Sequence, residues 1–337
     1  MIQEAIALLV ERRDLSREQA AEVMRELMEG RATHAQIGAL LTALRMKGEN
    51  VEEITGFAQT KRAFATRVPT ARRPLVDTCG TGGDHSNTFN ISTTAAFVVA
   101  GAGIPVAKHG NRSASSRCGS ADVLEALGVN IDAPPEIVGR CIDQAGIGFL
   151  FARHLHGAMK HVAGARMELR LRTVFNLLGP LTNPAGACGQ VMGVYDANWV
   201  EPLARTFLNL GARHVLVVAG SDGLDEMTLA GPTFVAEARN GEVRAYAAHP
   251  SALGFDAADR EALRGGEPSE NARILLSVLE GEQGPRRNVV VLNAAAGILV
   301  GQAAEDWRDA CRIAQQSIDS GAALHALNQL IRVSHDT

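Results

Sequence analysis

The stretch PLVDTCGTGGDHSNTFNISTTAAFVVAGAGIPVAK, residues 74–108, predicts a strand, a glycine-rich loop, a helix and a second strand. Residues 74–77 and 104–108 are short apolar runs typical of buried strands, and residues 90–103 form an apolar helix between them. A helical crossover of this kind makes the two strands parallel. Ligands bind beyond the carboxyl ends of parallel strands, so we expect a functional site in the loop at 78–90.

The same alternation of apolar runs and helical segments continues through the rest of the chain. Further strands are expected at 146–151, 191–195, 214–220 and 288–293, and further helices at 121–128, 199–211 and 294–301. This pattern predicts an α/β domain over 74–337, with a mainly parallel central sheet that helices cover on both faces.

Residues 1–67 predict a small helical domain, because capping boxes at 16–19, 33–36 and 50–53 each precede apolar residues at helical spacing. A bundle of this size cannot bury all of its apolar stripes alone. We therefore expect it to pack on the rest of the chain, including helices from about 165–185, or on a second copy.

The composition limits the partners of this protein. A formal net charge of −4 and only 4% aromatic residues argue against nucleic acid and against a membrane surface as partners. The apolar stripe around Leu40, Leu41 and Leu44 looks too apolar for a free surface, which predicts a homodimer through this region.

The cysteines and the N-terminus indicate a cytoplasmic protein. The five cysteines are widely spaced and contain no C-x-x-C pair, so neither a disulfide framework nor a zinc site is indicated, and free thiols in a reducing compartment are expected. The start, MIQEAIALLVERRD, lacks the basic region and cleavage site of a signal peptide.

The glycine-rich loop is suited to binding anions. Gly80, Gly82 and Gly83 permit a tight turn whose backbone N–H groups approach a ligand, and the helix that follows adds partial positive charge at its start. A tight turn with a helix cap is an equally probable interpretation of the glycines alone. Asp84 favours the ligand-binding interpretation. A carboxylate in this turn would repel a bound phosphate unless a cation or a ribose hydroxyl lies opposite the carboxylate.

Two further loops follow predicted strands. The loop at 108–120 combines lysine, histidine and arginines with four serines, which favours phosphate binding over a solvated basic loop. The loop at 220–233 holds Asp222, Asp225 and Glu226, which suits Mg²⁺ bound to a polyphosphate. A solvated acidic turn is the commoner explanation of such a cluster on its own.

Three arginines lie in the segment 164–184, at Arg166, Arg170 and Arg172. Their spacing of two to four residues places them on or beside a helix, and at least two of them are expected to be exposed.

Six motifs in this order and spacing resemble the anthranilate phosphoribosyltransferase family. They are GTGGD, NTFNIST, KHGNRSASS, GSADVLEALG, RTVFNLLGPLTNP and DGLDEMTLAGPT, and the similarity runs over nearly the whole chain. The resemblance implies a helical domain joined to an α/β domain like that of nucleoside phosphorylases, and a homodimer through the helical domains. It also implies transfer of phosphoribose from 5-phosphoribosyl 1-pyrophosphate to the amine of anthranilate, giving N-(5'-phosphoribosyl)anthranilate and pyrophosphate, the second step of tryptophan biosynthesis from chorismate.

The resemblance also implies the site residues. The positions that match contacts to phosphoribosyl pyrophosphate are Gly80, Gly83, Asp84, Thr88, Asn90, Ile91, Ser92, Thr93, Lys108, His109, Gly110, Asn111, Arg112, Ser113, Ala114, Ser115, Ser116 and Ser120. Those that match contacts to anthranilate are Gly80, Asn111, Arg166 and His156. Ser92, Asp225 and Glu226 match ligands of Mg²⁺, with two ions per subunit. No residue matches a general base; Arg166, Asn111 and His109 are expected to position the substrate.

The chain departs from the family pattern at a few positions. His85 and Ser86 replace small residues, Arg153 and Gly157 replace prolines, and Arg170 replaces a glycine. Arg153 and Gly157 flank His156, so the shape of the anthranilate entrance is where a difference is expected.

Two other functions compete with the transferase interpretation. A pyrimidine nucleoside phosphorylase shares the architecture, but KHGNR only partly matches the phosphate motif expected there, and the acidic pair would have no use. A non-catalytic relative that binds nucleic acid would lack the acidic pair and carry a basic face, whereas this chain keeps the pair and is acidic.

Overall fold

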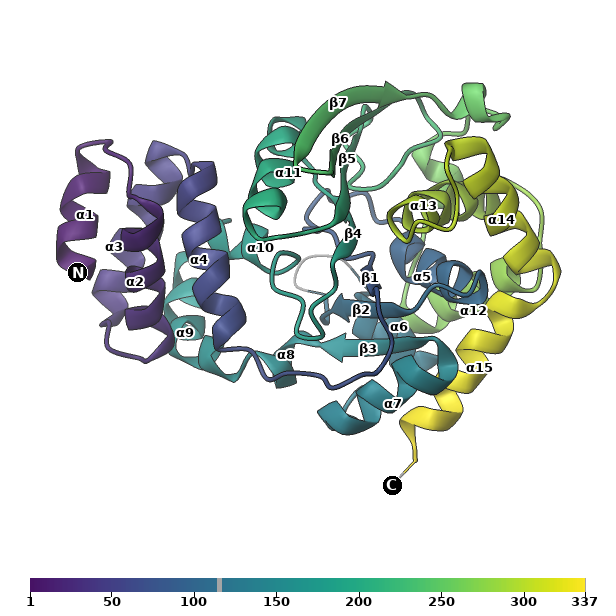
Figure 1. Cartoon of the computed structure of the whole chain (residues 1–337), viewed down its shortest axis with the longest axis horizontal. Coiled ribbons are helices and arrows are strands. Elements are labelled where there is room, and N and C mark those ends of the chain that lie inside the picture. The colour runs from purple at the N-terminus through teal and green to yellow at the C-terminus, as the bar shows by residue number, and fades with distance from the viewer. Residues whose placement is uncertain (114–116, 337) are drawn as a thin grey trace.

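A computed structural model describes residues 1–113 and 117–336, and shows a helical bundle beside a larger α/β part (Figure 1). The bundle consists of α1 (Ile2–Val10), α2 (Arg17–Met28), α3 (His34–Lys47) and α4 (Val51–Ala63). All three predicted capping boxes are confirmed: Ser16, Thr33 and Asn50 each accept a hydrogen bond from the backbone N–H three residues later, and the side chain there reaches back to the cap. Each box satisfies two N–H groups that a helix start leaves unpaired.

The apolar stripes of the bundle are buried within the single chain. Leu40, Leu41 and Leu44 have no exposed surface, so this stripe packs within the chain, as one of the two expected alternatives had it, and is not available to a second copy. The same core cluster includes Phe175 of α10 (Val174–Leu178) and Phe207 of α11 (Val200–Asn209). The bundle therefore completes its core against the α/β part, because four short helices cannot enclose their apolar faces alone.

One sheet of seven strands forms the centre of the α/β part. The strands are β1 (Val76–Asp77), β2 (Val106–Gly110), β3 (Ile147–Phe151), β4 (Gly189–Gly193), β5 (His214–Gly220), β6 (Thr233–Arg239) and β7 (Glu242–Ala248). Their order is β3-β2-β1-β4-β5-β6-β7, with parallel pairing from β3 to β5 and antiparallel pairing for β6 and β7. The predicted fold class, α/β with a mainly parallel sheet, is confirmed.

Helices lie on both faces of this sheet, and two more, α9 (Lys160–Leu169) and α10 (Val174–Leu178), pack on α2, α3 and α4 of the bundle. The remaining helices are α5 (Ile91–Gly101), α6 (Ser120–Ala126), α7 (Pro135–Ala145), α8 (Ala152–Leu155), α11 (Val200–Asn209), α12 (Pro268–Leu279), α13 (Pro285–Val300), α14 (Trp307–Asp319) and α15 (Ala322–Ser334), with short 3₁₀ turns η1 (Gly157–Met159), η2 (Ala197–Trp199), η3 (Pro250–Leu253) and η4 (Arg260–Leu263). Both faces of strand β5 are therefore buried. Val215 and Val217 belong to the core shared with the bundle, whereas Leu216 and Val218 belong to the core under α13.

Two elements differ from the sequence prediction. Residues 288–293, expected as a strand, lie inside helix α13. This helix packs against α5, α14 and β4 and is buried nearly all round, so its apolar run shows no helical periodicity. The antiparallel hairpin β6–β7 was not expected, because most of β7 is exposed or partly exposed and carries no continuous apolar run.

The strand order places a crevice at one point of the sheet. The chain proceeds outward from β1 to β2 and β3, and then returns to the other side of β1 with β4. In open α/β sheets, ligands bind where the strand order reverses, outside the carboxyl ends of the strands. The glycine-rich loop follows β1, and Tyr195 follows β4, so both lie at this reversal.

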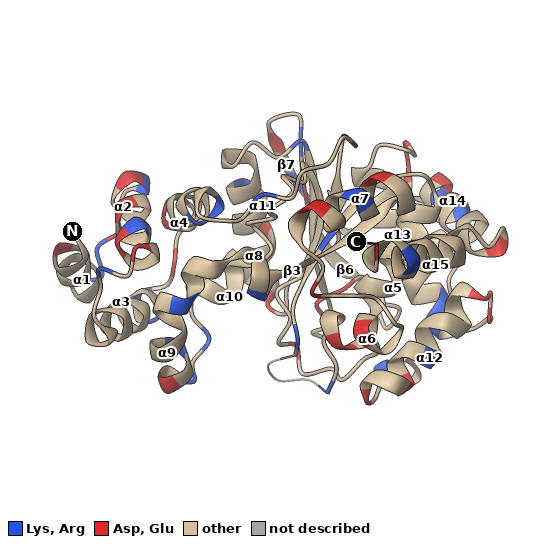
Figure 2. Cartoon of the chain, turned by 90° about the horizontal axis from the view of Figure 1, so that it is seen from below, with Lys and Arg blue, Asp and Glu red and all other residues tan. Residues whose placement is uncertain are grey.

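Acidic and basic positions are interspersed on helices of both parts, for example on α2, α9 and α14 (Figure 2). In the described part of the chain, no helix is both long and apolar enough to span a bilayer.

Candidate active site

One pocket, of about 420 Å³, lies beyond the carboxyl ends of β1 and β2. Nearly every predicted site residue within the described part of the chain lines it, and His156 is the exception. Ala114, Ser115 and Ser116 lie outside the described residues. Further lining residues include Arg172, Phe175, Asn176, Gly179 and Pro180.

The glycine-rich loop forms a tight turn on the pocket wall. Gly82 and Gly83 have φ of +62° and +83°, a left-handed conformation that glycine adopts without steric cost. The N–H of Thr81 donates to the carbonyl of Gly193 at 2.9 Å, which ties the turn to the end of β4. His85, which replaces a small residue of the family pattern, also has positive φ, of +54°. Histidine is one of the residue types that adopt this left-handed conformation more often than most.

Helix α5 starts beside this turn and carries no side-chain cap at Asn90. The N–H of Ser92 donates to Oε1 of Glu226 at 3.2 Å, and the Lys108 ammonium donates to Ser92 Oγ at 3.4 Å and to the Thr78 carbonyl at 2.9 Å. The helix start, a buried lysine and an acidic side chain thus meet at one side of the pocket.

Three carboxyl groups gather at the same side. Burial raises the pKa of Asp225 and of Glu226; the neighbouring Asp84 raises that of Asp225 further, and Asp225 does the same for Glu226. Oδ2 of Asp84 is buried and has no hydrogen-bond partner. Carboxylates crowded in this way indicate a site for a cation, since oxygen ligands with negative charge are those that Mg²⁺ prefers.

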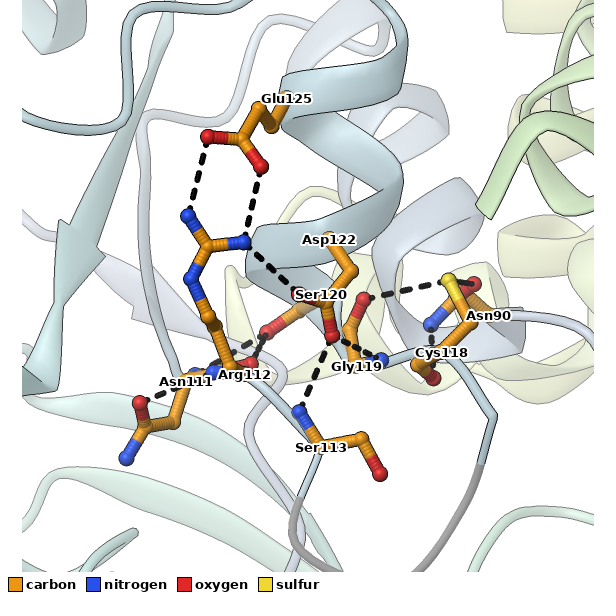
Figure 3. A network of polar contacts seen from close by, with 9 residues as sticks. All are labelled: Asn90, Asn111, Arg112, Ser113, Cys118, Gly119, Ser120, Asp122 and Glu125. Atoms are coloured by element: carbon orange, nitrogen blue, oxygen red, sulfur yellow. Dashed lines mark hydrogen bonds and ion pairs between the residues drawn. The ribbon is translucent and has the colours of Figure 1, made fainter. Parts of the chain in front are cut away.

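A network of polar contacts holds the two ends of the serine-rich loop together (Figure 3). Asp122 accepts hydrogen bonds from the N–H groups of Ser113 at 3.1 Å and Gly119 at 2.8 Å. The Arg112 guanidinium contacts Asp122 at 2.9 Å and makes a two-pronged ion pair with Glu125 at 2.8 and 2.9 Å. Arg112, predicted to bind the sugar phosphate, is therefore engaged by helix α6 in this conformation.

Two histidines form a buried pair at the other end of the pocket. Nε2 of His109 and Nε2 of His156 lie 3.2 Å apart, and His156 stands behind His109 and outside the pocket lining. Burial lowers the pKa of His109 to about 3 and that of His156 to about 2, with the nearby Lys61 adding to both effects. Both imidazoles are therefore neutral at pH 7.

Lys61 of α4 is a residue that the sequence motifs did not identify. Its ammonium is buried and donates to Oγ1 of Thr182 at 2.6 Å. Burial, followed by the charge of Arg166, lowers its pKa to about 7. A lysine on an amphipathic helix is usually exposed, so only the packing of the bundle on the α/β part could show this position.

The exposure of the three arginines in 164–184 differs from the prediction. Arg170 is exposed, whereas Arg166 and Arg172 are partly buried and line the pocket. The Arg166 guanidinium lies 5.1 Å from the centre of the Phe175 ring, and burial lowers its pKa. The prediction of at least two exposed arginines is wrong, because the turn from α9 to α10 directs Arg172 back toward the glycine-rich loop.

Comparisons with known proteins agree with this geometry. A family model described as "Glycosyl transferase family, helical bundle domain" matches residues 3–65, and one described as "Glycosyl transferase family, a/b domain" matches residues 72–324. The anthranilate phosphoribosyltransferase of Symbiobacterium thermophilum is 57% identical over 327 residues, which cover 97% of this chain and 96% of the relative. The chain belongs to the anthranilate phosphoribosyltransferase family.

Solved structures of anthranilate phosphoribosyltransferases support the same assignment. The crystal structure from Thermus thermophilus superposes with a TM-score of 0.93 at 45% identity, covering 98% of this chain and 99% of that one. The enzyme from Saccharomyces cerevisiae, in complex with PRPP (phosphoribosyl pyrophosphate) and Mg, superposes with a TM-score of 0.89 at 27% identity, covering 99% of this chain and 97% of that one. The family and the reaction predicted from the six motifs are confirmed, and the phosphorylase and nucleic-acid-binding alternatives are not supported.

Proposed function

We propose that phosphoribosyl transfer to anthranilate takes place in the described pocket, with each substrate at one end. The turn at Gly80–Gly83 offers the Gly83 N–H, which has no partner within the described part of the chain, to the phosphates of phosphoribosyl pyrophosphate, and the start of α5 adds partial positive charge beside it. Arg166 at the other end offers a guanidinium to the anthranilate carboxylate, and Asn111 lies on the same lining. The observation that carries the proposal is the convergence of the glycine turn, the acidic pair and Arg166 on one pocket.

The acidic side of the pocket suits Mg²⁺. The Saccharomyces cerevisiae relative was solved with PRPP and Mg, and here the unpartnered Asp84 oxygen lies beside two further buried carboxyl groups. We propose that Ser92, Asp225 and Glu226 hold the metal, with two ions per subunit. When bound, Mg²⁺ acts as a Lewis acid toward the charge that develops on the leaving pyrophosphate.

The side chains of the pocket position the reactants and do not move protons before the attack. An aromatic amine is neutral at pH 7, and its nitrogen can approach C1 of the ribose as the bond to pyrophosphate breaks through an oxocarbenium-like transition state. His109 and His156 are neutral and buried, so neither is an imidazolium that could donate a proton to the reactants. Alignment of the two reactants then accounts for most of the rate enhancement, and the fixed N–H dipoles of the glycine turn stabilise the leaving charge.

The test is a direct assay of the purified protein. Anthranilate, phosphoribosyl pyrophosphate and Mg²⁺ are mixed with the enzyme, and the loss of anthranilate fluorescence is followed. Turnover should require all three components. Turnover of a pyrimidine nucleoside with phosphate, in place of this reaction, would contradict the proposal.

We also propose a homodimer, although the buried stripe at Leu40–Leu44 no longer supports it. The support comes from other residues of the bundle, because Met46 of α3 and Met167 of α9 are each 71% exposed and these two helices pack together. Sedimentation at micromolar concentration should give the mass of two chains, and Met46→Glu with Met167→Glu should shift it to one. A wild-type mass of one chain would refute the dimer.

We place the protein in the cytoplasm, because Cys141 and Cys311 are buried thiols of the kind that persist in a reducing compartment. Fractionation of the source cells would test this, and recovery in a secreted fraction would contradict it.

A further inference from the structure

Arg172 links three parts of the pocket that the sequence motifs treat separately. It lies between α9 and α10, and its Nη2 donates to the carbonyl of Gly82 at 3.1 Å. Its guanidinium stacks on the ring of Tyr195, with 4.2 Å from the guanidinium carbon to the ring centre. Within the described residues it forms no ion pair with a carboxylate, and its Nε is buried without a partner. The side chain is thus fixed by a backbone carbonyl and a ring, neither of which neutralises its charge.

The hydrogen bond to Gly82 determines the direction of the next N–H group. A trans peptide is planar, and its C=O and N–H bonds point in opposite directions. Because the Gly82 carbonyl points toward Arg172, the Gly83 N–H points away from it. The N–H of Gly83 makes no hydrogen bond within the described part of the chain, and both glycines line the pocket. It is therefore free for a ligand.

Steric contact reinforces this orientation. A Cβ at Gly83 would overlap the Arg172 guanidinium, with Nη1 as the nearest atom, so the guanidinium packs directly against the turn, and the Tyr195 ring contacts it as well. With two glycines at positive φ, the Gly82–Gly83 peptide could otherwise rotate at little cost. The charge of Arg172 lies near Asp225 and offsets part of the pKa increase that burial causes there. The Gly82–Gly83 peptide is therefore held through its carbonyl and by the contact of Gly83 with the guanidinium.

We propose that Arg172 is a positioning residue for the pyrophosphate half of phosphoribosyl pyrophosphate: it holds the Gly82–Gly83 peptide so that the Gly83 N–H faces the ligand, and its stacking on Tyr195 fixes that geometry. This inference rests on the proposed placement of phosphoribosyl pyrophosphate on the glycine turn. It assigns Arg172 no contact with anthranilate, which distinguishes it from Arg166 in the same pocket.

The test uses variants of Arg172 with a matched control two residues away. Arg172→Ala should weaken binding of Mg²⁺–pyrophosphate, measured by calorimetry, and raise the KM for phosphoribosyl pyrophosphate, each by about 10- to 100-fold. The KM for anthranilate should stay within about twofold. Arg172→Lys should recover only part of the loss, since lysine keeps the charge but not the planar stack. The control, Arg170→Ala, removes an exposed arginine and should match the wild type.

Tyr195→Leu keeps the arginine and removes its stacking partner, so an intermediate loss of pyrophosphate affinity is expected. This variant and Arg172→Lys carry the test if Arg172→Ala does not fold by circular dichroism. Unchanged pyrophosphate affinity in the folded variants would overturn the role of Arg172. Equal increases in both KM values would overturn it too, because they would show that Arg172 supports the pocket as a whole. A wild-type protein that does not bind Mg²⁺–pyrophosphate at all would instead contradict the proposed function.

Discussion

Replacing Arg166 by alanine tests the anthranilate end of the pocket. Arg166 is partly buried, lies over the Phe175 ring and lines the pocket. Burial already lowers its pKa, which means that the surroundings disfavour its charge in the absence of an anion. A carboxylate placed against this guanidinium would therefore form a charge-assisted pair away from bulk water.

The magnitude follows from the strength of such a pair. A partly buried charge-assisted hydrogen bond contributes about 1.5–3 kcal/mol, so its loss should lower kcat/KM for anthranilate by about 10- to 150-fold. Arg166→Lys should recover part of the loss, because lysine retains the charge without the planar fork. The KM for phosphoribosyl pyrophosphate should change little, since that substrate is assigned to the glycine turn and the start of α5.

Steady-state kinetics by anthranilate fluorescence, with each substrate varied in turn, measure both effects. Arg170→Ala is the control, because Arg170 is exposed on the same segment and its loss should change stability by no more than about 0.5 kcal/mol. Equal defects for both substrates in Arg166→Ala would refute the reasoning and would show that Arg166 supports the pocket as a whole.

Three further outcomes are expected. Changing Asp225 and Glu226 together to alanine should abolish Mg²⁺-dependent turnover and leave the circular dichroism spectrum unchanged; near-normal activity would remove both from the metal site. Lys61→Met should raise the free energy of unfolding, most strongly at and below pH 7. The lysine has a pKa of about 7 in the folded protein and 10.5 in the unfolded chain, so the wild type gains stability as the pH rises between those two values and the advantage of the variant shrinks. Urea titrations at pH 7 and pH 10 that give the same difference between variant and wild type would contradict the burial of this charge. Arg170→Gly should stabilise the fold by roughly 0.5–1 kcal/mol in urea titrations. Arg170 has φ of +50° at the end of α9, a left-handed conformation that is unfavourable for arginine and costs glycine nothing. A loss of stability would show that the arginine side chain makes a compensating contact.

Features that depend on neighbouring residues in the chain were predictable from the sequence. The capping boxes at Ser16, Thr33 and Asn50 were confirmed because each is complete within four residues. The glycine-rich loop could be placed after a strand and before a helix for the same reason, and the described residues that matched the family motifs nearly all line one pocket. Their individual roles remain predictions, because motif matching gives position and not contact energy.

Features that depend on contacts between distant segments required the tertiary structure. The run at 288–293 became helix because burial on all sides removes the periodicity that separates a helix from a strand. The stripe at Leu40 became part of the interior because α1, α9 and α10 pack on α3. Arg172 stacks on Tyr195 and Lys61 donates to Thr182, and each of these partners lies in a later segment of the chain. The sequence by itself determined the local elements and the order of the binding loops. The tertiary structure decided which charges are buried and which backbone groups face the pocket, because burial and orientation depend on packing that no local sequence pattern records.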